Sequence, residues 1–169
     1  MGLTHAASLA HDLEQDHAMT DPSRLDRLFQ AMPPVAAMQV RALDFDGHTL
    51  RLTAPLAANV NDKACAFGGS LAGVMTLAGW GWLMLAAEDA GLASEVYVAD
   101  SQVRYLAPLF DDLVAEACLR PGQEWAAILR TLAERRRASA TMLTQIVAAD
   151  GTVVATLEAR FALKRVAAP

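Results

Sequence analysis

The stretch that decides the fold is residues 64–87, which read ACAFGGSLAGVMTLAGWGWLMLAA and contain no charged side chain. Two interpretations of this run are open, because its length is also that of a membrane-spanning helix. Its small residues do not decide between them, since glycine and alanine also line the interfaces of membrane helices. However, no second apolar run follows, and the remaining segments alternate with the period of strands. We therefore favour the buried helix of a soluble domain, whose small side chains let a sheet pack closely against it.

Upstream of this run, the pattern predicts one helix and one hairpin. Asp21-Pro22 is typical of a helix start, and Pro33-Pro34 is expected to end that helix. Residues 35–43 and 49–54 then read as two strands joined by a turn at Asp46-Gly47.

Downstream, the central helix is expected to end near Ala90-Gly91, where the glycine can take the left-handed capping conformation. The rest of the chain predicts four strands with a short helix between the second and the third, at residues 95–106, 113–119, 123–134 (the helix), 139–147 and 152–163. The sequence therefore predicts an α+β fold in which an antiparallel six-stranded sheet wraps around one long central helix. We expect residues 1–20 to form a flexible tail and residues 21–166 to form a single domain.

Composition narrows the partners and the cellular setting. A formal charge of -5, with no long basic stretch, disfavours a nucleic-acid partner, because clustered Lys and Arg supply most of that affinity. The first 20 residues lack the cationic start and the apolar run of a secretory signal. Cys65 and Cys118 lie far apart and read as buried, reduced thiols. We therefore expect a cytoplasmic protein.

The histidines indicate no metal site. His5, His11 and His17 are evenly spaced, but we interpret them as part of a polar tail, and His48 lies in the first hairpin turn. No cofactor or metal is therefore expected.

Two motifs flank the central run. Residues 59–70 read NVNDKACAFGGS, and residues 100–108 read DSQVRYLAP. Over about residues 25–165 the chain resembles the hotdog-fold putative thioesterases, and more narrowly the domain that occurs alone or fused behind a GNAT-type acetyltransferase. The resemblance implies a curved sheet around a central helix and two subunits whose sheets pair edge to edge. It also implies that acyl-CoA or acyl-carrier-protein thioesters bind between the subunits, so that coenzyme A or phosphopantetheine enters only as part of the substrate. We expect a homodimer, and two dimers can pair into a tetramer.

The glycines at the start of the central helix suit a thioester site. Hydrolysis needs hydrogen-bond donors where the carbonyl oxygen becomes an oxyanion, and a helix N-terminus presents unpaired N–H groups with a favourable dipole. Gly68, Gly69 and Ser70 provide such amides, and the two glycines leave room for a substrate against the backbone. The alternative is that the glycines only permit tight packing between helix and sheet.

The general base is harder to place. In the better-known branch of the resembled family, a His-Gly-Gly motif opens the helix, an Asn lies six residues before the His, and a carboxylate lies seven residues after the second Gly. Here the Asn is kept as Asn61, but Phe67 stands at the His position and Thr76 at the carboxylate position. Neither Phe67 nor Thr76 can act as a general base, so that branch's activation of water does not transfer to this chain.

Asp100 is the best candidate base, because it stands in an otherwise apolar strand beside Ser101. Asn61, Ser101 and Thr76 are then expected to hold the water or the thioester oxygen. Alternatively, the Asp100 carboxylate forms an ion pair with Arg104 or caps a neighbouring loop. A serine nucleophile is disfavoured, because no histidine stands ready to activate it.

The candidate substrate contacts are Lys63, Phe67, Gly68, Arg104 and Arg136. Lys63 stands at the start of the helix, where it can touch a phosphopantetheine arm or simply be solvated. Arg136 lies in the run Arg135-Arg136-Arg137, which can receive the phosphates of coenzyme A or mark a solvated start of a strand.

These observations predict a thioester hydrolase acting on acyl-CoA or acyl-ACP, in which helix N-terminal amides polarise the carbonyl for attack by water. The alternative is a hotdog module that binds acyl thioesters or lipids without turnover. Hydration or dehydration of an acyl thioester is a weaker third possibility, because that chemistry also needs a histidine.

Overall fold

The computed structural model describes residues 21–166, so the predicted tail at residues 1–20 lies outside the described part of the chain. The helices of the described part are α1 (Arg24–Ala31), α2 (Pro33–Met38), α3 (Gly68–Asp89) and α4 (Trp125–Arg135), with a short 3₁₀ helix η1 (Leu56–Ala58). Its strands are β1 (Arg41–Phe45), β2 (Thr49–Ala54), β3 (Ser94–Tyr105), β4 (Leu113–Leu119), β5 (Arg137–Val147) and β6 (Val153–Arg165).

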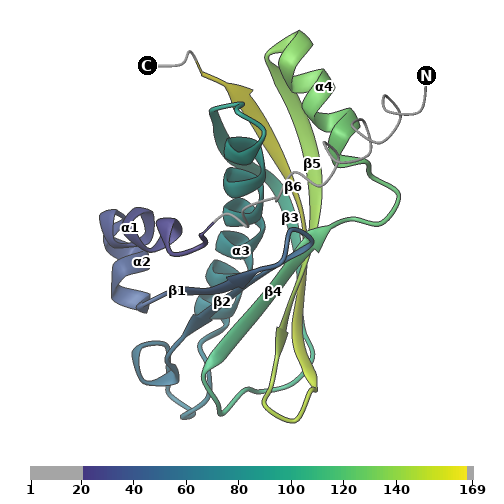
Figure 1. The fold of residues 1–169 in the computed structure, drawn as a ribbon. Coiled ribbons are helices and arrows are strands. Elements are labelled where there is room, and N and C mark those ends of the chain that lie inside the picture. The colour runs from purple at the N-terminus through teal and green to yellow at the C-terminus, as the bar shows by residue number, and fades with distance from the viewer. Residues whose placement is uncertain (1–20, 167–169) are drawn as a thin grey trace, which may run out of the picture.

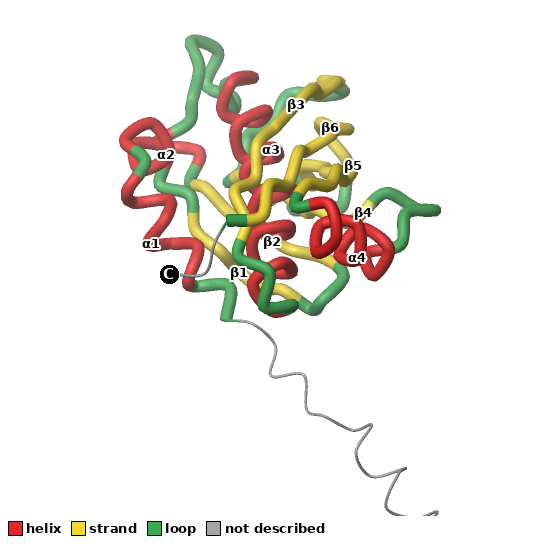
Figure 2. Tube along the Cα trace, turned by 90° about the horizontal axis from the view of Figure 1, so that it is seen from above, coloured by secondary structure: helices red, strands yellow, loops and turns green. Residues whose placement is uncertain are grey.

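The six strands form one antiparallel sheet in the order β1-β2-β4-β5-β6-β3. The sheet curves around α3, while α1 and α2 lie beside the helix and α4 packs near the start of β5 (Figures 1 and 2). This is the architecture that the sequence predicts. It leaves β1 and β3 as the two edge strands, and β3 is the longer, with 12 residues against five.

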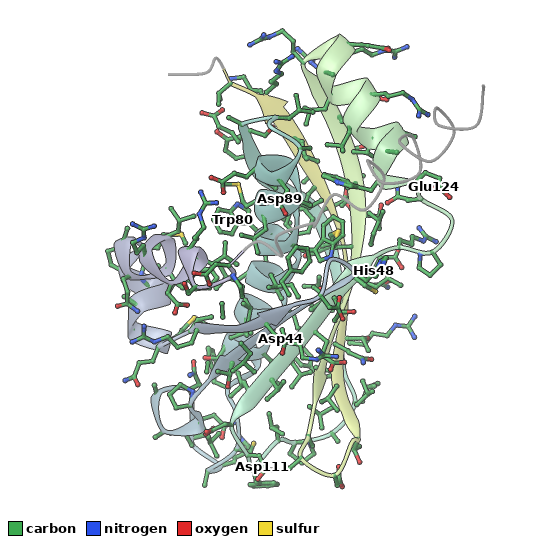
Figure 3. All side chains as sticks on the ribbon, viewed as in Figure 1. Asp44, His48, Trp80, Asp89, Asp111 and Glu124 are labelled. Carbon is green, nitrogen blue, oxygen red and sulfur yellow. The ribbon has the colours of Figure 1, made fainter. Side chains whose placement is uncertain are left out.

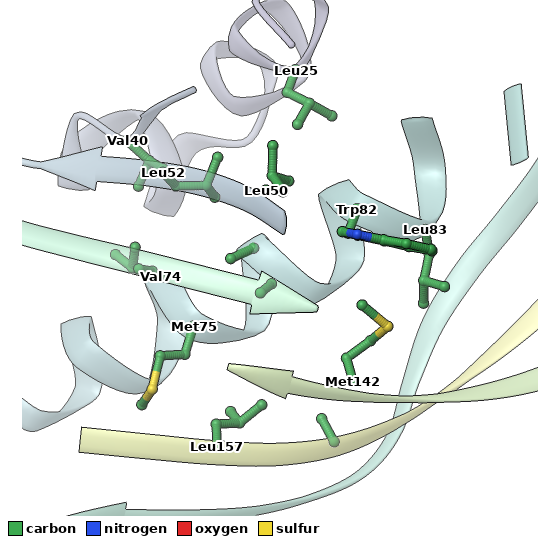
Figure 4. Packing of buried hydrophobic residues seen from close by; sticks show 14 of the residues in the cluster. Leu25, Val40, Leu50, Leu52, Val74, Met75, Trp82, Leu83, Met142 and Leu157 are labelled. Carbon is green, nitrogen blue, oxygen red and sulfur yellow. The ribbon is translucent and has the colours of Figure 1, made fainter. Parts of the chain in front are cut away.

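The uncharged run forms α3, which packs against the sheet. By length and composition alone this helix could cross a membrane, with a mean hydropathy of 1.4, yet 67% of its most apolar window is buried inside the fold. Figure 4 shows Val74 and Met75 of α3 among side chains of the sheet such as Leu50, Leu52 and Leu157. The structure thus agrees with the buried-helix interpretation of the run.

The end of α3 follows the prediction. Gly91 has a φ of +67°, and its N–H donates to the Glu88 carbonyl at 2.9 Å, while the Leu92 N–H donates to the Ala87 carbonyl at 2.9 Å. These two bonds satisfy carbonyls that the last helical turn leaves free. A non-glycine side chain at this position would be strained, so the glycine fixes where α3 stops and β3 begins.

One predicted strand is wrong in its first half. Residues 33–38 form helix α2, and β1 starts only at Arg41. Pro33 and Pro34 occupy the first turn of α2, where a missing N–H costs nothing, so the pair that ends α1 also begins the next helix. The six residues of α2 are too few for helical periodicity to show in the sequence.

The first helix begins two residues later than predicted. Asp21 accepts hydrogen bonds from the Ser23 N–H at 3.0 Å and from the Ser23 hydroxyl at 2.7 Å, which shapes a turn ahead of α1. The helix itself starts at Arg24.

Candidate active site

The loop before α3 is folded back tightly on itself. Val60 and Ala66 form an isolated antiparallel bridge, and the Asn61 N–H donates to the Cys65 carbonyl at 2.8 Å. The Asn61 Oδ1 accepts the Lys63 N–H at 2.7 Å, and its Nδ2 contacts Cys65 Sγ at 3.2 Å. The side chain of Asn61 therefore shapes the loop that delivers the chain to the helix.

Asn59 fixes this loop to the rest of the molecule, a role that the sequence does not reveal. It is buried, and its Nδ2 donates to the Met38 carbonyl at 2.9 Å and to the Pro55 carbonyl at 2.8 Å. The main-chain carbonyl of Asn59 accepts a hydrogen bond from the Phe67 N–H at 2.7 Å. Asn59 thus ties α2 to the residue immediately before α3, which explains why the unpredicted helix matters to the site.

The first turn of α3 presents free backbone donors. Phe67 is the N-cap residue and makes no side-chain capping bond; its carbonyl accepts the Leu71 N–H at 3.0 Å. This is the first hydrogen bond of the helix. The N–H groups of Gly68, Gly69 and Ser70 come before Leu71 in the chain, so the helix itself gives them no partner. These are the amides that the sequence predicts for an oxyanion.

Two aromatic rings stand beside these donors. The Phe67 ring lies over Gly69, so closely that a Cβ added to Gly69 would overlap with the ring. The Tyr105 hydroxyl donates to the Gly68 carbonyl at 3.1 Å, and its ring lies 3.5 Å from where a Gly68 Cβ would stand. The missing side chain of Gly69 therefore lets another group come close to the backbone, and within one chain that group is the Phe67 ring.

The start of α3 is bordered by exposed apolar side chains, here called the aromatic rim: Phe67, Tyr105, Leu106 and Phe110, which are 55–62% exposed. The Ala66 N–H donates to the Leu109 carbonyl at 2.8 Å, which holds the loop after β3 against the loop before α3. Figure 3 labels Asp111 at this end of the molecule. Large apolar side chains gathered in one exposed place are typical of a binding or association surface.

Asp100 and Ser101 lie on opposite sides of β3. The register shifts between Val98 and Asp100, and Asp100 pairs with the exposed Arg160, whereas Ser101 pairs with the buried Ala159. Ser101 is thus on the helix-facing side of the sheet, and Asp100 is on the outer side. Arg160 Nε donates to Asp100 Oδ2 at 2.9 Å. The partner of the Asp100 carboxylate is therefore Arg160 and not Arg104.

Arg104 also lies on the outer side of the sheet, opposite Thr156. It lines a cavity of about 500 Å³ together with Glu116 and Gln145. Thr76 lies on α3 two turns from its start, and its hydroxyl donates to the Ala72 carbonyl at 2.8 Å. Lys63 is exposed and forms an ion pair with Asp62 at 2.9 Å.

The structure thus gathers one part of the predicted set and separates the rest. Asn61, Lys63, Phe67, Gly68, Gly69 and Ser70 come together at the start of α3. Asp100, Arg104 and Arg136 lie elsewhere within a single chain. The structure adds Asn59 and Tyr105, both of which stand inside the two quoted motifs, although nothing in their spacing gives them a role.

The prediction of two buried cysteines holds for Cys65 but not for Cys118. Both are free, Cys65 is buried, and Cys118 is half-buried. Burial raises the pKa of the Cys118 thiol, with a further contribution from Glu116, so that it is protonated at neutral pH. Within residues 21–166, no group of three or more His, Cys, Asp and Glu side chains is arranged to hold a metal ion.

Comparison with known proteins identifies the domain. Residues 24–165 match the family model described as "Putative thioesterase (yiiD_Cterm)". The match covers most of the chain and includes the two motifs that flank α3.

Solved structures share the fold. A protein of unknown function from Chlorobaculum tepidum superposes with a TM-score of 0.80 at 25% identity, covering 86% of this chain and 94% of that one. A putative thioesterase from Shewanella oneidensis gives 0.72 at 28% identity, covering 84% and 97%. A probable thioesterase from Pseudomonas aeruginosa gives 0.71 at 25% identity, covering 88% and 99%. The predicted hotdog fold is confirmed.

Proposed function

This chain belongs to the putative thioesterase (yiiD_Cterm) family, and from that premise we propose that it hydrolyses acyl thioesters of coenzyme A or of an acyl carrier protein. The observation that carries the proposal is the start of α3, where backbone donors without helical partners meet exposed apolar rings. A thioester has the matching parts, which are a carbonyl oxygen to be polarised and an apolar acyl chain.

In the proposed reaction, water attacks the thioester carbonyl and the Gly69 and Ser70 amides hold the oxyanion. Preorganised donors of this kind are worth most where charge develops in the transition state. The carbon–sulfur bond then breaks, the acyl group leaves as a carboxylic acid, and the sulfur takes up a proton to become the free thiol of the carrier.

We assign the aromatic rim to the acyl chain and to a second subunit. The rings of Phe67 and Tyr105 border the amides, and Leu106 and Phe110 extend the apolar surface. Because this surface is open in one chain, a partner is needed to exclude water from the reacting thioester. The long, exposed edge strand β3 is the natural place for that partner, since its backbone groups are unpaired along one side.

The polar residues take supporting roles in this proposal. Asn61 shapes the loop, Lys63 is placed to meet the pantetheine arm, and Ser101 supplies a hydroxyl for the water or the thioester oxygen. The Thr76 hydroxyl donates to the Ala72 carbonyl, so it can only accept a hydrogen bond from the water. Asp100 is the base that the sequence suggests, but its carboxylate is paired with Arg160 on the outer side of the sheet, so we propose that it is dispensable for turnover.

A second candidate is an acyl-thioester-binding module without turnover. It is favoured by one observation: Phe67 caps α3 where a histidine would be wanted, and the Thr76 hydroxyl is bonded to its own helix. Such a module needs the aromatic rim but no base.

Product analysis in ¹⁸O-labelled water separates these functions. We expect the purified protein to convert a saturated acyl-CoA into free thiol and a fatty acid that carries one solvent oxygen. Binding of acyl-CoA in a calorimeter without product in the same sample would instead favour the module. An enoyl-CoA that gains the mass of water while keeping its thioester would indicate hydration.

A further inference from the structure

Positive charge concentrates at the junction of α4, β5 and β6. This basic cluster consists of Arg135, Arg136, Arg137, Lys164 and Arg165, all exposed except the half-buried Arg165. In a chain of net charge -5, five cations so close together are a local exception. The cluster lies at the end of the molecule where α4 stops and the chain leaves β6 (Figure 1).

The fold gives these charges little compensation. Arg137 and Lys164 stand directly opposite each other in the β5–β6 ladder, which is an unfavourable pairing of like charges. Among the described residues, Lys164 alone of the five forms an ion pair, with Glu95 at 3.7 Å. Arg136 and Arg165 make long contacts with main-chain carbonyls, at 3.4 and 3.5 Å. The cluster is therefore available to an anion from outside the subunit.

Within one subunit, the cluster is far from the start of α3. Arg165 pairs with Ser94 at the beginning of β3, whereas Tyr105 at the other end of β3 contacts Gly68. The helix between these two ends has 22 residues and is about 33 Å long. The cluster and the oxyanion amides of the same chain therefore occupy opposite ends of the domain.

A two-fold pairing of β3 with its own copy removes this separation. Two copies of one strand related by such an axis run antiparallel, so Ser94 of one subunit comes beside Tyr105 of the other. Since Arg165 is the neighbour of Ser94 in the sheet, each cluster then lies at the same end as the other subunit's aromatic rim. Tyr97 and Val98, both about half exposed, supply apolar contact along this edge.

We propose that Arg135, Arg136 and Arg137 of one subunit, assisted by Lys164 and Arg165, bind the phosphates of a coenzyme A whose thioester is cleaved at the α3 start of the other subunit. This rests on the proposed thioesterase function and names both its carrier and the subunit that holds it. Arginine forks match phosphate geometry, and three phosphate groups are the anionic part of coenzyme A. The thioester and the nucleotide of one substrate thus contact different subunits.

The first test compares two thioesters that differ only in the carrier. The variant is Arg135→Gln/Arg136→Asn/Arg137→Gln. Asparagine is chosen at position 136 because the backbone there is left-handed, with a φ of 60°, which asparagine tolerates. We expect its KM for acyl-CoA to rise at least tenfold, while its KM for the same acyl group on N-acetylcysteamine is unchanged. That second substrate lacks the nucleotide and also reports that the variant is folded. Arg27→Gln, an exposed arginine on α1, is the control and should change neither KM.

An unchanged KM for acyl-CoA in the triple variant would overturn the proposal, even if both thioesters are hydrolysed. If neither thioester is hydrolysed, the proposed function fails, and calorimetry with adenosine 3′,5′-bisphosphate decides the cluster separately. Binding by the wild type that weakens at least tenfold in the triple variant supports the phosphate site. The site is refuted if the wild type does not bind, or if the wild type and the triple variant bind equally well.

The second test asks which subunit supplies the cluster. One subunit carries Gly69→Val, which blocks its α3 start, and the other carries the triple variant; the two are co-expressed with different tags and purified as mixed dimers. In such a dimer the only intact α3 start belongs to the subunit that carries the triple variant, and the only intact basic cluster belongs to the other subunit. Wild-type KM for acyl-CoA at about half the kcat shows that the arginines act across the interface, and a KM as high as that of the triple variant contradicts it.

Discussion

At the scale of single residues, Gly69 separates a chemical role from a packing role. Gly69→Ala would place a methyl group under the Phe67 ring, beside the amides proposed to hold the oxyanion, and the ring must then move. The ring is exposed and free to move, and alanine favours the helix by about 1 kcal/mol, so the free energy of unfolding should change little. We expect kcat for acyl-CoA to fall at least tenfold, measured by thiol release.

Gly73→Ala is the matched control, because it makes the same change one turn further along α3. Its added Cβ would meet only the end of the flexible Met38 side chain, at 3.1 Å. We expect near wild-type activity and stability. If Gly69→Ala is as active as Gly73→Ala, the first turn of α3 is not the oxyanion site.

Asp100 carries the second prediction at this scale. Its carboxylate is 63% exposed and bound to Arg160, which is the environment of a surface ion pair. Such pairs contribute about 0–1 kcal/mol to stability. We therefore expect Asp100→Asn to keep the kcat of the wild type and the shape of its pH profile. A large loss of kcat, together with loss of the acidic limb of that profile, would show instead that Asp100 is the general base.

At the scale of elements, β2, β4 and β5 are joined across the outer side of the sheet by Glu116. Arg51 Nε donates to Glu116 Oε1 at 2.9 Å, and Gln145 Nε2 donates to Oε2 at 3.0 Å. These bonds, that of Arg51 first, lower the pKa of Glu116. Because the folded-state pKa lies below the unfolded one, the charged carboxylate stabilises the fold at neutral pH, and this contribution disappears as the pH falls through the folded-state pKa.

We therefore expect Glu116→Gln to lower the free energy of unfolding by about 0.5–1 kcal/mol at pH 7, measured in urea. The difference from the wild type should shrink once the pH falls below the ordinary pKa of glutamate, about 4.3, and disappear below the lowered folded-state pKa. Glu158→Gln is the control, since its ion pair with Arg120 is about half exposed and should matter less. A pH-independent difference for Glu116→Gln would mean that the effect comes from packing rather than from charge.

How far the sequence predicts the elements depends on the length of their pattern. The run from Ala64 to Ala87 predicts α3 because 24 residues carry one unbroken signal, and the strands after it alternate long enough to be placed within two residues. Helix α2 has no such length, and Asn59 acts through bonds to α2 and η1 that no local pattern encodes. The face on which Asp100 lies was equally hidden, because the register shift in β3 reverses the alternation there.

At the scale of the whole molecule, the proposed site requires a dimer built on β3. Val98 is half exposed in the middle of this edge, and Val98→Lys would place a charge against the β3 strand of the other subunit. We expect this variant to sediment as a monomer and to lose activity, because the α3 start then stays open to water. Leu43→Lys is the matched control, since Leu43 is 50% exposed on the other edge strand, β1. If Leu43→Lys dissociates the dimer and Val98→Lys does not, the interface lies on β1 and not on β3.

The candidate site divides in the same way between what one chain shows and what needs two. The amides of Gly68, Gly69 and Ser70 and the ring of Phe67 were predictable from the motif, because they are local in sequence, whereas Tyr105 reaches Gly68 from 37 residues away. The proposed completion of the site by a second subunit, and the proposed use of Arg136 there, depend on which strand lies at the edge of the sheet. Spacing along the chain does not contain that information.

The central claim is that this domain cleaves acyl thioesters with the amides at the start of α3. The most direct measurement is the initial rate of thiol release from a panel of acyl-CoA substrates of increasing chain length, with the wild type, Gly69→Ala and Gly73→Ala side by side. We expect turnover by the wild type and by Gly73→Ala, and a rate at least tenfold lower in Gly69→Ala. A folded, dimeric wild-type protein that releases no thiol above buffer from any member of the panel would contradict this claim.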